Sequence, residues 1–556
     1  MISNNHSTTT HSTVTKWLLI LAAVLISTVH LKQFYYSYDT IKWLIFDVIL
    51  STLVIINWPK KQNFLISYFG LLFLTLIAYM LFSLSHAPNI MMGIEFIMRF
   101  FLVFVLGHML VKRYSKRELL EWTLLSVVIS ALFFSIQFVL ERHLFVYSYN
   151  VGSFSPFGFK NNAGQVFNIW VPCLVLFIFL NRQSLWKAAL GAILLLFVVS
   201  LLMEAGTRGP AVGLVLGELL VFSIMLFQNP KRAVYFLSVT LLLGSGMLLY
   251  KFSDALQGGN LSGRLASMEN NIAASSGQRI QLFQNTWEMT LDNPIGVGIN
   301  NFEYIHPKYG NPGTPEFSPY INERQVLRTP HNIVLKLYSE IGLIGGTLFL
   351  IMLGYLLLSA FYNAIKGTLI DKWLLVAVVA TLFHSMVSAV FLTPGSLLFS
   401  FLLFALVQSR FLTAYKPSFQ LQINFYLMAR WSILTIPLLS GCIIISAFFA
   451  YHGRLQFDDK LLLKALAFNP HNDRALYTLS HVYYRRDRDV QASLETINSF
   501  ISINPYHLAG LYIQCERQFQ LHEIRHAKDG IDNLLDIYPT YSKARRLQQT
   551  IDLKLK

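Results

Sequence analysis

The sequence predicts an all-α protein, a polytopic membrane helix bundle with about 12–13 transmembrane helices followed by a C-terminal α-solenoid. Three observations support this prediction. The 556 residues are 54% hydrophobic and 13% charged, which is roughly half the charged fraction of a soluble protein. Apolar runs of about 17–25 residues, long enough to span a bilayer, recur from Trp17 to Ala450. Beyond Ala450 the chain becomes amphipathic, with regularly spaced prolines.

Loop charge predicts how these helices are oriented. The candidate spans are residues 17–31, 41–57, 64–84, 93–111, 119–140, 165–181, 186–203, 209–228, 232–250, 333–360, 372–392, 396–412 and 430–451. Lysines and arginines gather in the loops after even-numbered spans, and short cytoplasmic loops carry this excess. Residues 1–16 are therefore predicted to be cytoplasmic, and the 251–332 loop and the chain after residue 451 to lie outside. Because this pattern accounts for the net charge of +15, no nucleic-acid partner is predicted.

The C-terminal part has an internal repeat. Asn469-Pro470, Asn504-Pro505 and Tyr538-Pro539 are spaced by 35 and then 34 residues, and each closes a helical stretch. This period, with proline ending each unit, is typical of tetratricopeptide repeats. We therefore predict a transmembrane domain over 17–451 and a repeat domain over 452–556, whose surface would bind a protein partner.

The sequence lacks the motifs of several kinds of binding and catalytic site. The three cysteines form no CxxC pair, so neither a disulfide framework nor a cysteine metal site is indicated. The sequence has no GxxxxGK[ST] motif for ATP and no HExxH motif for zinc. The one Asp-x-Asp, at Asp487-Arg488-Asp489, lies in the repeat domain. No metal ion or other cofactor is predicted.

His331 is the most informative residue. It lies in Thr-Pro-His-Asn at the end of the long polar loop, directly before an apolar helix that carries Gly342, Gly345 and Gly346. An ionisable group at the edge of the lipid is a functional candidate. Its titration near neutral pH makes His331 a candidate acid, base or anion contact.

Two arginines are candidate anion contacts, since a guanidinium binds two oxygens at once. Arg208 lies in a short glycine-containing turn between two spans, near Glu204; the alternative is an arginine that extends to the membrane interface. Arg279 begins an amphipathic segment that ends at Asn293-Pro294; the alternative is a solvated surface charge. Glu204 pairs with an arginine or orients one.

A third polar segment opens the sixth span. Lys160, Asn161 and Asn162 stand between an outer loop and an apolar helix. They are candidates to bind sugar hydroxyls or a phosphate. Interfacial anchors and helix caps would use the same residue types, so both interpretations stay open.

Taken together, these residues resemble motifs of the O-antigen ligase and polymerase superfamily, the Wzy/WaaL-like glycosyltransferases with a GT-C fold. The matching elements are His331-Asn332 followed after nine residues by Gly342 and then Gly345, Arg208-Gly209, and Arg279 before Asn293-Pro294 and Gly296-Val297-Gly298. The resemblance covers about residues 152–404.

The resemblance implies an inverting, metal-independent enzyme at the periplasmic face of a bacterial inner membrane. It would move a glycan from undecaprenyl diphosphate to a hydroxyl of lipid A–core or of a protein Ser/Thr. Arg208, Arg279 and His331 would be catalytic, with the arginines stabilising charge on the departing diphosphate. Lys160, Asn161, Asn162, Glu204 and Asn332 would bind substrates. Members of this family that glycosylate proteins commonly carry a Gln-Pro-Asn-type element, which is absent here.

Three alternatives remain open. A Wzy-type polymerase would use another lipid-linked repeat unit as acceptor. A polysaccharide transporter or flippase would place charged residues around a cavity at the bilayer midplane, whereas here they collect at one face. An interaction scaffold would present the repeats without needing His331, Arg208 and Arg279 together.

Overall fold

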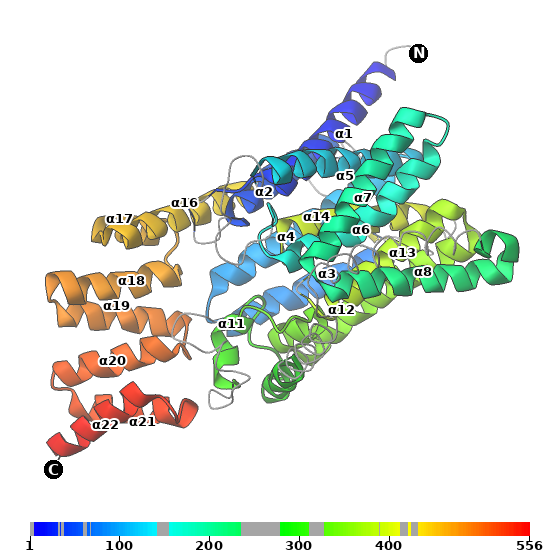
Figure 1. Ribbon diagram of the computed structural model, residues 1–556. Coiled ribbons are helices and arrows are strands. Elements are labelled where there is room, and N and C mark those ends of the chain that lie inside the picture. The colour runs from blue at the N-terminus through cyan, green and yellow to red at the C-terminus, as the bar shows by residue number, and fades with distance from the viewer. Residues whose placement is uncertain are drawn as a thin grey trace, which may run out of the picture.

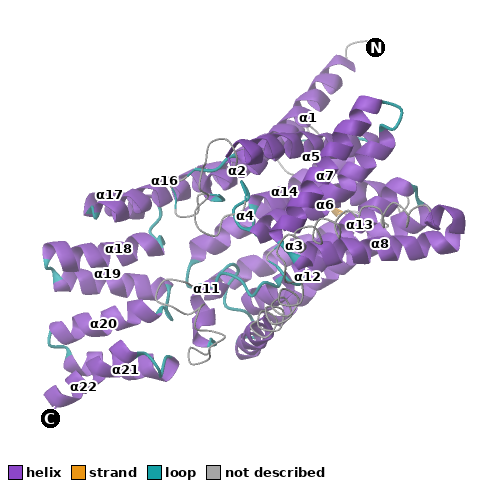
Figure 2. Cartoon of the chain, viewed as in Figure 1, coloured by secondary structure: helices purple, strands orange, loops and turns teal. Residues whose placement is uncertain are grey.

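The computed structural model describes residues 5–31, 34, 38–58, 64–66, 68–141, 155–234, 279–310, 327–388, 390–411, 421–423 and 432–555. Figure 1 shows a bundle of long helices beside a stack of short helices formed by the C-terminal part. Nearly all of the described elements are helical, as the colouring in Figure 2 shows. The predicted all-α class and the polytopic bundle with a C-terminal solenoid are confirmed.

The bundle consists of long apolar helices. They are α1 (Asn5–Thr28), α2 (Thr40–Asn57), α3 (Tyr68–Ser83), α4 (Ile90–Arg113), α5 (Lys116–Val139), α6 (Lys160–Leu180), α7 (Leu185–Ala205), α8 (Arg208–Gln228), α12 (Ile333–Lys366), α13 (Leu369–Ser385), α14 (Pro394–Phe411) and α16 (Thr435–Gln456). In the described part of the chain, 11 helices are long and apolar enough to cross a membrane. The 17-residue α13 is not among them. The chain is therefore a multi-pass membrane protein.

Some predicted span limits were wrong. The span predicted at 64–84 begins with a strand, β1 (Phe64–Ile66), which pairs antiparallel with β2 (Leu421–Ile423). In the span predicted at 372–392, helix α13 already ends at Ser385. Apolar runs show that a segment is buried but do not show where its backbone leaves the helix. The span predicted at 232–250 lies outside the described residues, apart from 232–234.

Contacts between chain segments sort the loops into two faces. At one face, Lys16 Nζ lies 2.7 Å from Glu121 Oε1, and β1 pairs with β2. At the other face, the side-chain amide of Gln137 donates to the carbonyl of Thr28 at 2.9 Å. Each contact joins segments that loop charge places on the same side. Which face is cytoplasmic remains a prediction.

Large apolar side chains also cover the outside of the bundle. Leu196 on α7 is 60% exposed, and Leu219 and Phe227 on α8 are 51% and 91% exposed. On a soluble protein such a surface would promote association. In a bilayer it faces hydrocarbon at no cost, which agrees with the composition.

Helix α12 is broken at Gly342, where φ is 71° and ψ is −176°. The break frees backbone groups on both sides, and a neighbouring loop satisfies them. The N–H groups of Val297 and Gly298 donate to the carbonyls of Ser339 and Glu340 at 3.1 and 2.9 Å. The N–H of Leu343 donates to the carbonyl of Pro294 at 2.9 Å. Irregular backbone at membrane depth requires such internal partners.

The C-terminal part is a stack of antiparallel helices. They are α17 (Asp459–Phe468), α18 (Asp473–Val482), α19 (Val490–Ile503), α20 (Leu508–Gln520), α21 (Ile524–Ile537) and α22 (Ser542–Leu555), with a π-helical turn (Tyr483–Asp487) after α18. Asn469, Asn504 and Tyr538 are the C-caps of α17, α19 and α21. The predicted helix ends before each proline are thus confirmed. The assignment to tetratricopeptide repeats and the domain limits remain predictions; α16 itself continues past residue 451 to Gln456.

We expect Gly342→Ala to destabilise the protein. A Cβ at Gly342 would lie 2.3 Å from the carbonyl oxygen of Pro294, on a backbone with positive φ. The backbone strain alone should cost about 1–3 kcal/mol, and the clash adds to it. Thermal unfolding in detergent measures the loss.

Gly354→Ala is the matched control in the same helix. A Cβ there meets nothing within 4 Å, so better helix propensity should leave stability equal or higher by about 0.5–1 kcal/mol. Equal melting temperatures for the two variants would contradict the role of the break.

Candidate active site

His331 lies directly before α12 with its backbone in the left-handed region, at φ 56°. Its N–H donates to Thr329 Oγ1 at 3.2 Å. Non-glycine residues rarely adopt this conformation, and where they do the strain often serves a site. The next residue, Asn332, caps α12, because its side-chain oxygen accepts from the N–H groups of Val334 and Leu335 at 2.9 and 3.0 Å. Asn332 thus has a structural task, and its predicted substrate contact stays a prediction.

Arg279 is the first described residue of a helix over 279–292 and is exposed. Its charge acts on two imidazoles, those of His331 and His384. Burial, followed by this charge, lowers the pKa of His331 below its usual value. His331 is therefore neutral at pH 7 and able to accept a proton.

His384 is a residue that sequence reasoning missed. It lies near the end of α13 and is 2% exposed. Its Nδ1 is 3.0 Å from Nδ2 of Asn168 on α6. Because an amide nitrogen only donates, Nδ1 accepts and the neutral ring carries its proton on Nε2. The sequence feature that could have identified His384 is its position as a single ionisable residue within an apolar run.

Arg208 begins α8 immediately after a sharp turn. Gly206, at φ 63°, ends α7, as expected for a glycine in a tight turn. Arg208 and Glu204 are exposed, whereas Thr207 between them is buried. A Cβ at Gly209 would lie 2.7 Å from Cδ2 of His384. The start of α8 therefore packs directly against the second imidazole.

The start of α6 completes this face. A Cβ at Gly164 would contact Pro210, Thr207 and His384. One helical turn earlier, Lys160 is exposed and Asn161 is half-buried. Asn162 donates to the carbonyl of Phe157 at 3.3 Å, a local contact. The first turn of α6 thus borders the face formed by α8 and α13.

A buried polar cluster supports the end of α13. Gln165 Nε2 donates to Ser388 Oγ at 3.1 Å, and Thr393 Oγ1 donates to Ser396 Oγ at 2.9 Å. Phe391, between these residues, has a positive φ of 72°. Its N–H donates to Ser396 Oγ at 3.1 Å. These hydrogen bonds connect the described parts of the segment between α13 and α14 to one another and to α6.

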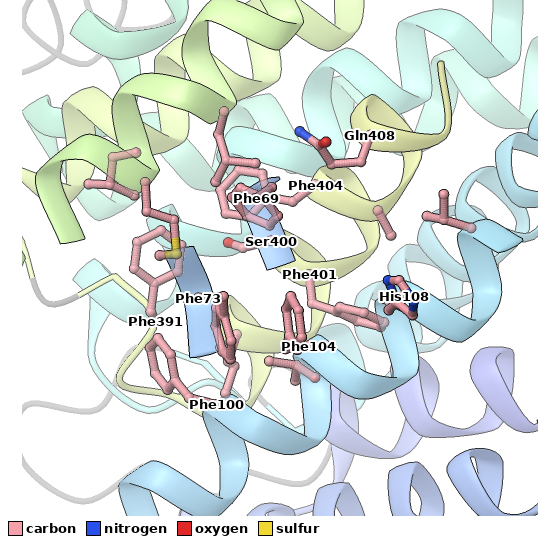
Figure 3. A pocket seen from close by; sticks show the side chains of 18 of the residues that line it. Phe69, Phe73, Phe100, Phe104, His108, Phe391, Ser400, Phe401, Phe404 and Gln408 are labelled. Carbon is pink, nitrogen blue, oxygen red and sulfur yellow. The ribbon is translucent and has the colours of Figure 1, made fainter. Parts of the chain in front are cut away.

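An apolar cavity lies between α3, α4, α12 and α14. Phenylalanine side chains surround it, together with His108, Ser400 and Gln408, as Figure 3 shows. Its lining runs from Phe100 to Val111 on α4 and from Leu397 to Gln408 on α14. Eleven helical steps correspond to about 16 Å, so the cavity is long and parallel to the helices. Phe391 joins its wall to the loop after α13.

Comparison with known proteins adds one match. Residues 192–350 match the family model described as O-antigen ligase. This match supports the resemblance to the O-antigen ligase superfamily. No curated protein matches the chain.

The O-antigen ligase match contains Glu204, Arg208, Arg279, His331 and Asn332 but ends before His384. It also contains Gly342 and the loop that docks against it. A domain of this family supports glycosyltransferase activity of the ligase or polymerase type, with a lipid-linked glycan as donor. The predicted residues thus lie on elements that meet, and their individual roles remain predictions.

The charge of Arg279 should be measurable at His331. Arg279→Gln removes a positive charge that lowers the pKa of His331, so that pKa should rise. Diethylpyrocarbonate modifies neutral imidazole, and its rate at His331, followed by mass spectrometry across pH, reports the midpoint. We expect a higher midpoint in Arg279→Gln.

Arg182→Gln is the control, since Arg182 is an exposed arginine in the turn between α6 and α7. It should leave the midpoint unchanged. The same midpoint in Arg279→Gln and in the wild type would place Arg279 away from His331.

Proposed function

We propose that the protein is an inverting, metal-independent glycosyltransferase that moves an oligosaccharide or polysaccharide from undecaprenyl diphosphate to an acceptor hydroxyl. The observation that carries this proposal is the position of Arg279, whose charge acts on His331 and His384 while His384 packs against Gly209 beside Arg208. The reaction would take place at the periplasmic face of a bacterial inner membrane.

The chemistry suits these groups. The acceptor oxygen forms a bond to the anomeric carbon from the face opposite the diphosphate, and the bond from that carbon to the diphosphate oxygen breaks. Negative charge then grows on the lipid diphosphate. Arg208 and Arg279 would stabilise it, because preorganised cations act strongly where water is scarce.

His331 would take the proton of the acceptor hydroxyl. Its lowered pKa supports this role over that of a diphosphate contact, because a neutral imidazole accepts a proton and attracts an anion only weakly. Glu204, Lys160, Asn161 and Asn162 would bind the sugars around the two arginines.

The position of the helical stack indicates which class of acceptor the protein uses. Asn89, at the start of α4, donates to the carbonyl of His471 at 3.2 Å, and Asn89 also contacts Asn301 in the loop that docks at Gly342. The stack therefore stands on the same face as His331. This placement favours an acceptor large enough to contact both, namely a protein Ser/Thr, over lipid A–core. A polymerase would use the same groups with a second lipid-linked glycan as acceptor.

Loss of any of the three principal groups should abolish transfer while the protein remains in the membrane. We expect kcat/KM to fall roughly 10²–10³-fold for Arg208→Ala or Arg279→Ala, and about 10²–10⁴-fold for His331→Ala. A purified assay with lipid-linked glycan, offering a protein, a lipid A–core and a lipid-linked acceptor in turn, measures rate and acceptor class together.

Arg182→Ala again serves as the control and should transfer normally. If His331→Ala transferred glycan as fast as the wild type, His331 would have no catalytic role. If the wild-type protein transferred glycan to none of the three acceptors, the proposed reaction would be wrong.

The long apolar cavity would hold part of the isoprenoid chain of the donor. Ala405 lines it and is 8% exposed, so Ala405→Phe would place a ring in the space. Excluding as few as two CH₂ groups costs about 1.6 kcal/mol. We therefore expect KM for an undecaprenyl donor to rise about tenfold.

A donor with a chain of about ten carbons is the internal control, because it is too short to fill the cavity, and its KM should not change. An equal change for both donors would show a general packing defect, and no change for either would place the chain elsewhere.

A further inference from the structure

Helix α11 (Phe302–Ile305) is a single turn between the stack of short helices and the bundle, as Figure 1 shows. Its first three residues contact three different parts of the protein. Phe302 contacts α12, Glu303 contacts the segment before His331, and Tyr304 contacts the stack. None of these residues belongs to the site described above.

Phe302 connects α11 to the first part of α12. Its N–H donates to Glu340 Oε1 at 3.0 Å. The same oxygen accepts from Lys336 Nζ, and both of these side chains are buried. Removing one partner of a buried pair leaves an uncompensated charge, which is strongly destabilising. The position of α11 relative to residues 333–341 is therefore well determined.

Glu303 connects α11 to the segment that ends at His331. Its Oε2 lies 3.4 Å from Nε of Arg328, three residues before His331. Lys336 Nζ also donates to the carbonyl of Arg328 at 3.4 Å. An exposed ion pair contributes little stability, and the Arg328 side chain is 46% exposed. The expected effect is thus on position rather than on stability.

Tyr304 connects α11 to the stack. It is 2% exposed and packs with Leu476 of α18 and Leu494, Ile497 and Phe500 of α19. Its hydroxyl accepts from Asn89 Nδ2 at 3.0 Å. A core position for Tyr304 means that α11 moves with α18 and α19 rather than with solvent-exposed loops.

We propose that α11 couples the helical stack to His331, with Tyr304 as the anchor and Glu303 as the positioning residue that holds the Arg328–His331 segment. The chemical step would then depend on how the stack is seated. A partner bound to the stack could act on transfer through this contact without touching the reacting atoms. This inference rests on the proposed function for its rate effects only.

Charged groups around Glu303 make the contact sensitive to pH. The groups that face it are Arg328, Lys336 and Glu340 together with Asp473 and Arg474 of α18. Burial, followed by the carboxylate of Asp473, raises the pKa of Glu303 to about 7, while Lys336 opposes the shift. Glu303 is charged above that pH, so its ionic contact with Arg328 strengthens as pH rises through about 7 and is lost as pH falls.

Tyr304→Ala in the full-length protein tests the anchor. Hydrogen–deuterium exchange should become faster in residues 327–335 as well as in the stack. In a transfer assay, kcat should fall about tenfold while KM for the donor stays within about twofold. Tyr304→Phe keeps the ring and should behave nearly as the wild type in both measurements.

Glu303→Gln tests the positioning residue without changing packing. In this variant the transfer rate should no longer rise around pH 7. The fall in rate at lower pH, which protonation of His331 causes, should remain. The double variant Tyr304→Ala/Glu303→Gln should be no slower than Tyr304→Ala alone by more than about twofold, since both act along one path.

Faster exchange confined to the stack in Tyr304→Ala, or a pH profile unchanged in Glu303→Gln, would overturn the proposal. Exchange requires no glycan transfer. The exchange experiment therefore tests the coupling independently of the proposed reaction, and the transfer assay tests the reaction independently of the coupling.

Discussion

At Gly342 the backbone of α12 leaves helical geometry, and the rest of the face that carries His331 depends on how that break is filled. Three backbone hydrogen bonds from the 294–298 loop replace those that the helix loses. Each is worth about 0.5–1.5 kcal/mol when formed, and more is lost when a buried group stays unpaired. The loop therefore has one position relative to α12. The helix over 279–292, which carries Arg279, leads into this loop, and His331 precedes the same part of α12, so the docked loop constrains both.

The arrangement places cationic and neutral groups side by side. Arg279 is exposed at the start of its helix, while His384 is buried against Gly209 and Asn168. Keeping the imidazoles neutral avoids the cost of burying further charge beside a guanidinium. In the proposed reaction, the positive charge would stabilise an anionic leaving group and an uncharged imidazole would act as the base for a hydroxyl. Transfer from a lipid diphosphate needs both.

The helical stack is connected to the bundle near the site. It is joined to the bundle through the continuous helix α16, through Asn89 and through Tyr304. The last two contacts involve the segments that support the broken α12. An acceptor or partner held by the stack would thus be presented to the face that carries His331 in a defined orientation. The long cavity is lined by later parts of α4 and α12, from Phe100 and Phe349 onward. The proposed lipid-chain site therefore lies further along these helices than the acceptor side.

The sequence by itself determined the membrane class, most of the spans, the sorting of loops and the helix ends before each repeat proline. These follow from local properties, namely apolar length, charge in short loops and residues that cannot continue a helix. It also singled out Arg208, Arg279 and His331, since polar groups beside apolar runs stand out.

Only the tertiary structure decided that the charge of Arg279 acts on two histidines, that the 294–298 loop docks at the break in α12, and that Tyr304 belongs to the core of the stack. His384 and Lys336 are hidden within apolar helices, where one polar residue gives no sign of its partner. Those pairings join residues far apart in the chain, and packing between helices sets them, which no local pattern encodes.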